Sequence, residues 1–227
     1  MKYFMAGIKG SGMSGLACML HDLGNEIIGY DDLTYYAVTE PPLRERNIPI
    51  YNDVSHLDKG MIVINTAAIH EDHKVIKRAR ELHLTVKGYF EIIGDLTRKY
   101  NSICIAGTHG KTTTTALLSR ILVNTIGTNY LIGDGTGFID KESNNFVIES
   151  CEFERHFLNY TPSYAIVTNI ELDHVDCYKN VDEIIEVFNE FINKAKNGVI
   201  ACGDDLNVRK LKAPNITYYG FNDDNDV

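Results

Sequence analysis

The segment 103–115 constrains the fold most, because an apolar run there opens onto a Gly-Lys-Thr turn and then onto a helical stretch. Gly107 and Gly110 allow a tight turn whose amides point inward. Lys111 supplies a positive charge for the β- and γ-phosphates of a nucleotide, and Thr112 offers a hydroxyl to a magnesium ion. The segment therefore predicts a strand, a phosphate-binding loop and a helix.

The predicted loop departs from the common G-x-x-x-x-G-K-[ST] pattern, because Ile105 occupies the place of the first glycine. We therefore expect a shortened loop. Threonines fill positions 112–115 although β-branched residues are poor at the start of a helix, which favours phosphate binding over a turn that only caps the helix. The residues expected to bind ATP are Gly107, Thr108, His109, Gly110, Lys111, Thr112 and Thr113.

Short apolar runs alternate with helical patterns along the whole chain, and this alternation indicates parallel sheets with crossover helices. The expected strands are residues 3–8, 26–30, 61–65, 102–106, 146–149, 164–168 and 199–202. The expected helices are residues 13–23, 72–82, 111–123 and 181–196. The predicted fold class is therefore α/β.

Glycine-rich strand-to-helix turns recur near residues 10 and 108, and each begins a new α/β unit. We expect a Rossmann-like N-terminal domain over residues 1–98 and a P-loop-type ATP-binding domain over residues 99–227. Residues 218–221 resemble a strand that runs out into the acidic stretch 222–226. The second domain is accordingly expected to be truncated.

The composition is that of an ordinary globular protein with room for two domains, since 44% of the 227 residues are hydrophobic and 23% are charged. A net charge of −9 without a basic cluster argues against nucleic acid or an anionic membrane as partner. The five cysteines form no C-x-x-C pair, which is typical of reduced cytosolic thiols. No apolar run has the length of a signal or a membrane span, so a soluble cytoplasmic protein is expected.

The first glycine turn, residues 7–14, follows the first expected strand. The strict G-x-G-x-x-G pattern fails at Lys9, so nicotinamide or flavin binding is weakly supported. The amides of residues 10–13 could still hold a diphosphate, and Asp31 follows the second strand at the distance of a ribose-binding acid. An acid at a strand end can also only cap the next turn, and both interpretations of Asp31 stay open.

Two later strands are followed by side chains that suit a phosphate site. Glu149 ends one strand, and His174 lies in an Asp-His-Val-Asp run after the next. Ligands of doubly wound folds gather beyond the carboxyl ends of the strands, so these two side chains could converge with Lys111 and Thr112 on one phosphate and its magnesium. Taken alone, the glutamate could be a solvated acid and the histidine structural. Their shared position favours the functional interpretation.

Two further patterns are weaker. His70 and His73 have an H-x-x-H spacing, but no cysteine or third histidine stands at ligand spacing, so a zinc site is rejected. Glu152, Glu154 and Arg155 precede an apolar pair and are interpreted most simply as the start of a helix, although the arginine or the histidine after it could contact an anionic ligand.

Taken together, several motifs in order along the chain resemble the Mur ligases. Lys9 in place of the commoner glycine, and Glu-Ser-Cys-Glu in place of the commoner Glu-Ala-Asp-Glu, look like variants within that family. The resemblance runs through essentially the whole chain, and the segments that carry it are residues 7–14, 107–112, 131–137, 149–152, 168–174 and 201–205.

The resemblance, which is nearest to the branch that adds L-alanine, implies an ATP-dependent ligase of peptidoglycan synthesis. ATP would phosphorylate the lactyl carboxylate of UDP-N-acetylmuramate, and the amine of L-alanine would then displace phosphate from the acyl phosphate. Lys111, Glu149 and His174 would be catalytic, with the lysine neutralising charge on the transferred phosphoryl group. Thr112 and Glu149 would hold one Mg²⁺ and His174 a second. The UDP-sugar would contact Gly10, Ser11, Gly12, Met13, Ser14, Asp31, Thr66, Ala67 and Ala68.

Members of the family also carry the rest of the central domain and a third domain that helps to bind ATP and the amino acid. Neither is found in this sequence, so the chain is expected to be a fragment that binds its nucleotides weakly and does not ligate alone. Two alternatives stay open. One is a relative that joins a recycled murein peptide to the same sugar nucleotide, and the other is a non-catalytic nucleotide-binding module.

Overall fold

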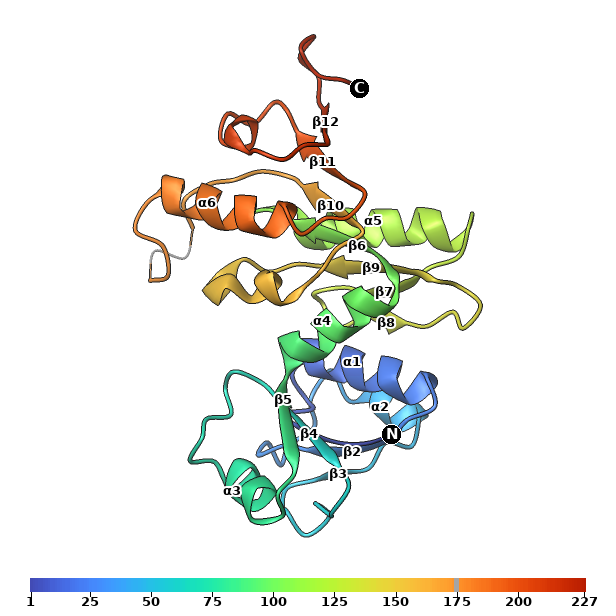
Figure 1. Cartoon of the computed structure of the whole chain (residues 1–227). Coiled ribbons are helices and arrows are strands. Elements are labelled where there is room, and N and C mark those ends of the chain that lie inside the picture. Colours follow the sequence, from blue (N-terminus) through green and yellow to red (C-terminus); the bar gives the residue numbers. More distant parts are fainter. Residues whose placement is uncertain (174–175) are drawn as a thin grey trace. The chain divides into compact units, whose positions relative to one another are not determined.

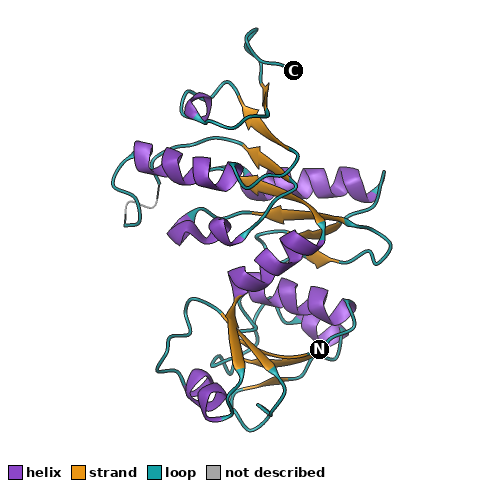
Figure 2. Cartoon of the chain, in the orientation of Figure 1, coloured by secondary structure: helices purple, strands orange, loops and turns teal. Residues whose placement is uncertain are grey.

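The computed structural model describes residues 1–173 and 176–227, which form two compact units (Figures 1 and 2). Unit 1 comprises Met1–Ile92 and Leu131–Lys141, and unit 2 comprises Ile93–Tyr130 and Glu142–Val227. Each unit is built on strands paired in parallel, which confirms the predicted α/β class. Within the described ranges, no helix is long and apolar enough to cross a membrane.

Unit 1 is a parallel sheet with the strand order β3-β2-β1-β4-β5. Its strands are β1 (Lys2–Ala6), β2 (Glu26–Tyr30), β3 (Ile50–Tyr51), β4 (Ile62–Asn65) and β5 (Thr85–Gly88). Its helices are α1 (Ser11–Asp22), α2 (Pro41–Glu45) and α3 (Lys74–Glu81), and α4 (Tyr89–Lys99) leads from unit 1 into unit 2. The chain moves outward from β1 in one direction through β2 and then in the other through β4, so a topological switch point lies beside β1.

The core of unit 1 follows from the alternation of side chains along β1. Phe4 and Ala6 face α3 and pack in one buried cluster with Tyr30, Val63 and Ile76. The helices α1 and α2 lie on the other side of the sheet (Figure 1). Because β1 is buried on both faces after Lys2, residues 3–6 are apolar or aromatic rather than alternating with polar ones.

A segment distant in sequence completes unit 1. The turn within Leu131–Lys141 packs against α1 so closely that an added Cβ at Gly15 would lie 2.5 Å from the carbonyl oxygen of Gly135. A Cβ at Gly135 would in turn lie 2.6 Å from the carbonyl oxygen of Ser11. Glycine is therefore required on both sides of this contact between backbones.

Unit 2 contains most of a sheet with the strand order β12-β11-β10-β6-β9-β7-β8. The bounds are β6 (Asn101–Ala106), β7 (Asn129–Leu131), β8 (Gly137–Phe138), β9 (Asn145–Glu149), β10 (Tyr164–Val167), β11 (Gly198–Cys202) and β12 (Ile216–Tyr219). The helices are α5 (Lys111–Val123) and α6 (Val181–Ile192), with short 3₁₀ turns η1 (Phe153–Asn159) and η2 (Val208–Lys210). The central strand β6 pairs in parallel with β9 and β10, so the carboxyl ends of all three meet at one edge.

The expected strands and helices are all present, with ends that shift by a few residues. The last strand ends at Tyr219, and the acidic stretch after it turns back, since the amides of Asp226 and Val227 donate to the carbonyl of Tyr218. The division between the units falls inside α4, whereas the predicted boundary lies between residues 98 and 99 at the end of that helix.

Substituting Gly15→Ala tests the contact between α1 and the 131–141 turn. Alanine is better than glycine in a helix by up to about 1 kcal/mol, but the new Cβ would overlap a backbone carbonyl, and overpacking typically costs about 1–3 kcal/mol. We expect a net loss of stability in urea unfolding followed by circular dichroism. The control Gly198→Ala, whose Cβ would meet nothing closer than 3.7 Å, should leave the midpoint nearly unchanged. Equal effects of the two substitutions would contradict the contact.

Candidate functional site

The turn between β6 and α5 has the backbone that a phosphate loop requires. Gly107 has a φ of 143° and Gly110 a φ of 80°, which are conformations that L side chains rarely adopt. Gly110 is the N-cap of α5, and no side chain caps the helix there. By contrast, His73 and Asn180 cap α3 and α6 with their side chains. The first amides of α5 are thus left for an external acceptor.

The segment after β10 fixes the outer half of this loop. The side chain of Asn169 accepts from the His109 amide at 2.8 Å and donates to the His109 carbonyl at 3.0 Å. The Asn169 carbonyl accepts from the Thr108 amide at 3.1 Å. Thr108 and His109 were predicted to bind ATP, and in this structure their amides donate to Asn169. The amides at the start of α5 take no part in these contacts.

Lys111 folds back over the loop that precedes it. Its ammonium donates to the carbonyls of Gly107 and Thr108 and forms an ion pair with Glu152 at 3.1 Å. The side chains of Lys111 and Glu152 are only 13% and 3% exposed. Glu152 is the N-cap residue of η1 but makes no capping hydrogen bond with its side chain, so its interpretation as only the start of a helix was incomplete.

The residues predicted to hold magnesium lie on neighbouring elements. Glu149 ends β9 in register with Ile105 of β6, beside the loop, and Thr112 lies in the first turn of α5. Carboxylate and hydroxyl oxygens suit Mg²⁺, which usually takes few protein ligands and completes its shell with water and phosphate oxygens. Among described residues, no group of three or more His, Cys, Asp and Glu side chains could hold a metal ion. His174, the predicted third ligand, lies outside the described residues.

The glycine turn of unit 1 likewise leads into a helix that no side chain caps. Gly7 has a φ of 80°, Gly10 is the N-cap of α1, and no side chain caps that helix. Thr66 follows β4 and lies beside Gly7, where an added Cβ would be 3.2 Å from the threonine methyl group. The predicted contacts at residues 10–14 and 66–68 therefore meet at the carboxyl ends of β1 and β4.

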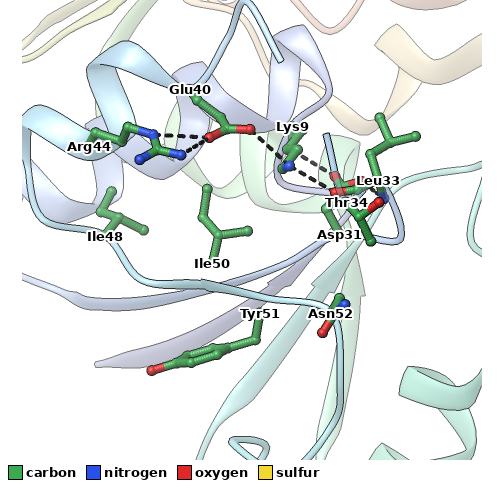
Figure 3. Close-up of a pocket in the computed structure, with 10 residues that line it drawn as sticks. All are labelled: Lys9, Asp31, Leu33, Thr34, Glu40, Arg44, Ile48, Ile50, Tyr51 and Asn52. Carbon is green, nitrogen blue, oxygen red and sulfur yellow. Dashed lines mark hydrogen bonds and ion pairs between the residues drawn. The ribbon is translucent and has the colours of Figure 1, made fainter. Parts of the chain in front are cut away.

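A cavity of about 430 Å³ opens beside this turn (Figure 3). Asp31 lies on its wall, and its carboxylate accepts from the amides of Lys9 and Leu33 at 2.9 and 3.0 Å. The structure thus gives Asp31 the turn-capping contact that the sequence allowed, and it also exposes the residue to a cavity. The cavity is lined by Lys9, Asp31, Leu33, Thr34, Glu40, Arg44, Ile48, Ile50, Tyr51 and Asn52.

One wall of the cavity is held by a buried ion pair. Lys9 Nζ lies 2.8 Å from Glu40 Oε1, and their side chains are 7% and 3% exposed. The same ammonium donates to the carbonyls of Leu33 and Tyr35. Arg44 binds the other oxygen of Glu40 (Figure 3). The hydrogen bond from Lys9 lowers the pKa of Glu40 from 4.5 to about 2. Lys9 therefore fixes the loop between β2 and α2.

Other ionisable groups near the sites are shifted by burial. Burial and the nearby charge of Glu152 raise the pKa of Tyr178 to about 12, and its hydroxyl donates to the Glu152 carbonyl. Burial raises the pKa of the Cys151 thiol and lowers that of His156. These groups keep their uncharged forms at neutral pH. His73 of the H-x-x-H pair contacts Asp32 at 3.0 Å, besides capping α3.

Sequence reasoning missed the roles of three residues. Asn169 was part of a recognised motif, but only the fold brings its amide group to the loop 60 residues earlier. Glu152 was a charged residue among others, and its burial gave no signal in the sequence. Lys9 was noted only as a departure from the glycine pattern, although a lysine in an otherwise small and apolar turn is a sign that its charge has a partner.

Two family models match successive parts of the chain. Residues 2–101 match the family model described as the Mur ligase family catalytic domain, and residues 105–227 match that of the Mur ligase middle domain.

Solved structures of similar fold include three ligases. The first is a UDP-N-acetylmuramate:L-alanyl-γ-D-glutamyl-meso-diaminopimelate ligase from Neisseria meningitidis, with 21% identity, a TM-score of 0.83, and coverage of 97% of this chain and 78% of that one. The second is a UDP-N-acetylmuramate-alanine ligase from Thermotoga maritima, with 26% identity, a TM-score of 0.80 and coverage of 91% and 50%. The third is a pseudomurein peptide ligase from Methanothermus fervidus, with 20% identity, a TM-score of 0.64, and coverage of 96% of this chain and 48% of that one. The chain thus spans about half the length of two of these relatives.

Acid unfolding tests the Lys9–Glu40 pair. A carboxyl whose pKa is lowered in the folded state contributes stability that is complete above pH 4.5 and is lost as the pH falls towards 2. Glu40→Gln should abolish this component and, because it leaves a buried ammonium unpaired, should lower stability at pH 7 by about 3 kcal/mol. The measurement is urea unfolding between pH 2 and 7. Glu26→Gln removes an exposed ion pair with Lys2. It should change neither the stability at pH 7 nor the loss of stability in acid appreciably. An unchanged acid profile in Glu40→Gln would refute the assignment.

Amide exchange tests the contact of Asn169 with the phosphate loop. Asn169→Ala removes the acceptor for the His109 amide, so that amide should exchange with deuterium at least tenfold faster, and stability should fall by about 2 kcal/mol. Asn193→Ala is the matched control, because the side chain of Asn193 also hydrogen-bonds to backbone groups, the carbonyls of Asn189 and Lys212. It should leave exchange at His109 unchanged. Slow exchange of His109 in the Asn169 variant would show that other contacts hold the loop.

Proposed function

The chain belongs to the Mur ligase family, and from that premise we propose that it forms the nucleotide-binding part of a ligase that joins L-alanine to UDP-N-acetylmuramate in peptidoglycan synthesis. Members of the family are ATP-dependent ligases that form amide bonds. In the proposed reaction ATP phosphorylates the lactyl carboxylate of the sugar nucleotide, and the amine of L-alanine displaces phosphate from the acyl phosphate.

The observation that best supports the proposed ATP site is the start of α5, which follows a glycine turn and has no side-chain cap. Lys111 and Glu149 lie at the same edge of the sheet. Residues 110–113 would hold the phosphates through their amides, and Lys111 would leave its loop carbonyls to neutralise the γ-phosphoryl group as it transfers. Thr112 and Glu149 would hold one Mg²⁺, which screens phosphate charge when bound. The proposal keeps His174 as ligand of a second ion on the strength of the family resemblance.

The sugar nucleotide is proposed to bind in unit 1. The amides at the start of α1 suit its diphosphate, and residues 66–68 at the end of β4 border the same edge. The cavity beside Asp31 is polar on one side and apolar at Ile48 and Ile50, and its volume falls in the range of small-molecule sites. We propose that it receives the uridine end of the ligand.

The incoming nucleophile distinguishes this proposal from its nearest alternative, because similar solved structures include both an alanine ligase and a ligase of a murein peptide. The glycine turn at residues 7–14 favours the alanine ligase. A ligation assay with the full-length protein, offering L-alanine and the tripeptide in parallel, decides between them. Faster turnover of the tripeptide would favour the alternative, and binding without any turnover would favour a non-catalytic module.

Isothermal titration of these 227 residues with a magnesium–ATP analogue tests the ATP site. Lys111→Ala should weaken binding at least tenfold, equivalent to about 1.4 kcal/mol, because it removes the only side-chain cation of the loop between residues 107 and 113. Arg120→Ala removes a cation farther along α5 and should bind as the wild type does. Equal binding by Lys111→Ala and wild type would refute the site.

A further inference from the structure

The turn that follows β11 has no role among those assigned so far, although residues 201–205 carry one of the recognised motifs. Its two aspartates bind different segments. The carboxylate of Asp204 accepts from the amide of Phe221, in the segment after β12. The carboxylate of Asp205 instead accepts from the amide of Ile170, in the segment after β10. The second aspartate therefore links the turn to the segment that contacts the phosphate loop.

The link at Ile170 involves both groups of its backbone. Its amide donates to one carboxylate oxygen of Asp205 at 3.3 Å, and its carbonyl accepts from the side-chain amide of Asn207 at 2.8 Å. The other oxygen of Asp205 accepts from the amides of Asn207 and Val208, each at 2.8 Å. The side chain of Ile170 is fully buried. The turn after β11 thus holds Ile170 from one side.

The residues next to Ile170 bind the phosphate loop. The side chain of Asn169 both accepts from and donates to the backbone of His109. The amide of Glu171 donates to the Thr108 hydroxyl at 2.9 Å, and that hydroxyl donates to the Glu171 carbonyl at 3.3 Å. Successive residues of this segment therefore bind the turn after β11 and the phosphate loop in alternation.

This alternation connects three strands at one edge of the sheet. Strand β11 pairs in parallel with β10, and β10 pairs in parallel with β6, which leads into the phosphate loop. Contacts to the backbone of a segment limit its local opening. Loss of the two bonds at Ile170 would let residues 169–171 move away from β11, and the loop residues bonded to them would gain freedom. Binding a ligand would then cost more ordering entropy.

Resting on the proposed ATP site, we propose that Asp205 and Asn207 are positioning residues for the phosphate loop. They hold Ile170, and they act on the loop through Asn169 and Glu171. The role differs from those proposed for Lys111, Thr112 and Glu149, which contact the nucleotide or its magnesium ion.

The first test is amide exchange measured without nucleotide. Asp205→Ala should speed deuterium exchange of the His109 amide at least fivefold, because the segment that carries its acceptor is no longer held. Asp204→Ala is the matched control from the same turn, since its carboxylate also accepts from backbone amides, those of Phe221 and Asn222 at 2.7 and 3.2 Å. It should leave exchange at His109 unchanged. Equal exchange at His109 in the two variants would overturn the proposal.

Asn207→Ala gives an independent variant, which also serves if circular dichroism shows that Asp205→Ala does not fold. It removes the donor to the Ile170 carbonyl and should speed exchange at His109 at least threefold. Asn193→Ala is the control, because its side chain likewise donates to backbone carbonyls. Unchanged exchange at His109 in Asn207→Ala would contradict the proposed hold.

The second test is titration with the magnesium–ATP analogue. Asp205→Ala should raise the Kd at least threefold, and Asp204→Ala should change it less than twofold. A residue that acts through Asn169 should also have less effect once Asn169 is alanine. The Asp205→Ala, Asn169→Ala double variant should therefore raise the Kd by less than the product of the two single effects. The full product would show independent actions and would overturn the proposal.

The ATP site and the positioning role fail differently. If the wild type does not bind the analogue while His109 exchanges faster in Asp205→Ala, the ATP site is refuted and the hold on the loop stands. If exchange is faster and all variants bind the analogue equally, the ATP site stands and the positioning role is refuted.

Discussion

The close approach of Gly107 to Thr168 is the constraint on which the site in unit 2 depends. An added Cβ at Gly107 would overlap the hydroxyl oxygen of Thr168, far inside van der Waals contact, so no other residue permits the loop to run against the end of β10. That approach brings Asn169 to His109 and fixes the loop before any ligand binds. A loop fixed in advance loses little entropy when phosphate arrives, which favours affinity and correct orientation.

The two units share an arrangement of sheet, glycine turn and helix. Each has a parallel sheet, a glycine turn after its first strand, and a helix whose N-cap is a glycine without a side chain to occupy its amides. In each, a buried lysine–glutamate pair lies beside the turn: Lys9 with Glu40 and Lys111 with Glu152. The first pair belongs to a structural loop with several further hydrogen bonds. The second involves Lys111, the lysine that the proposed reaction needs.

The fold class and the main elements could be predicted from sequence because they depend on local patterns. Strand β6, the glycine turn and α5 are adjacent in the chain, so the order of their apolar residues and glycines in the sequence predicts all three. The short strands β3 and β8 have two residues each and carry no periodicity. The docking of residues 131–141 on α1, the contact of Asn169 with His109 and the burial of Glu152 depend on the tertiary fold. Such contacts between distant segments leave no pattern in a single sequence. The role of Glu149 at the end of β9 stays a prediction.

Hydrogen–deuterium exchange with each ligand in turn tests the central claim that the chain carries two separate nucleotide sites. UDP-N-acetylmuramate should slow exchange at residues 7–14 and 31–40 and leave residues 107–113 unaffected. The magnesium–ATP analogue should do the reverse. Protection of the same segment by both ligands, or of neither segment by either ligand at saturating concentration, would contradict the account.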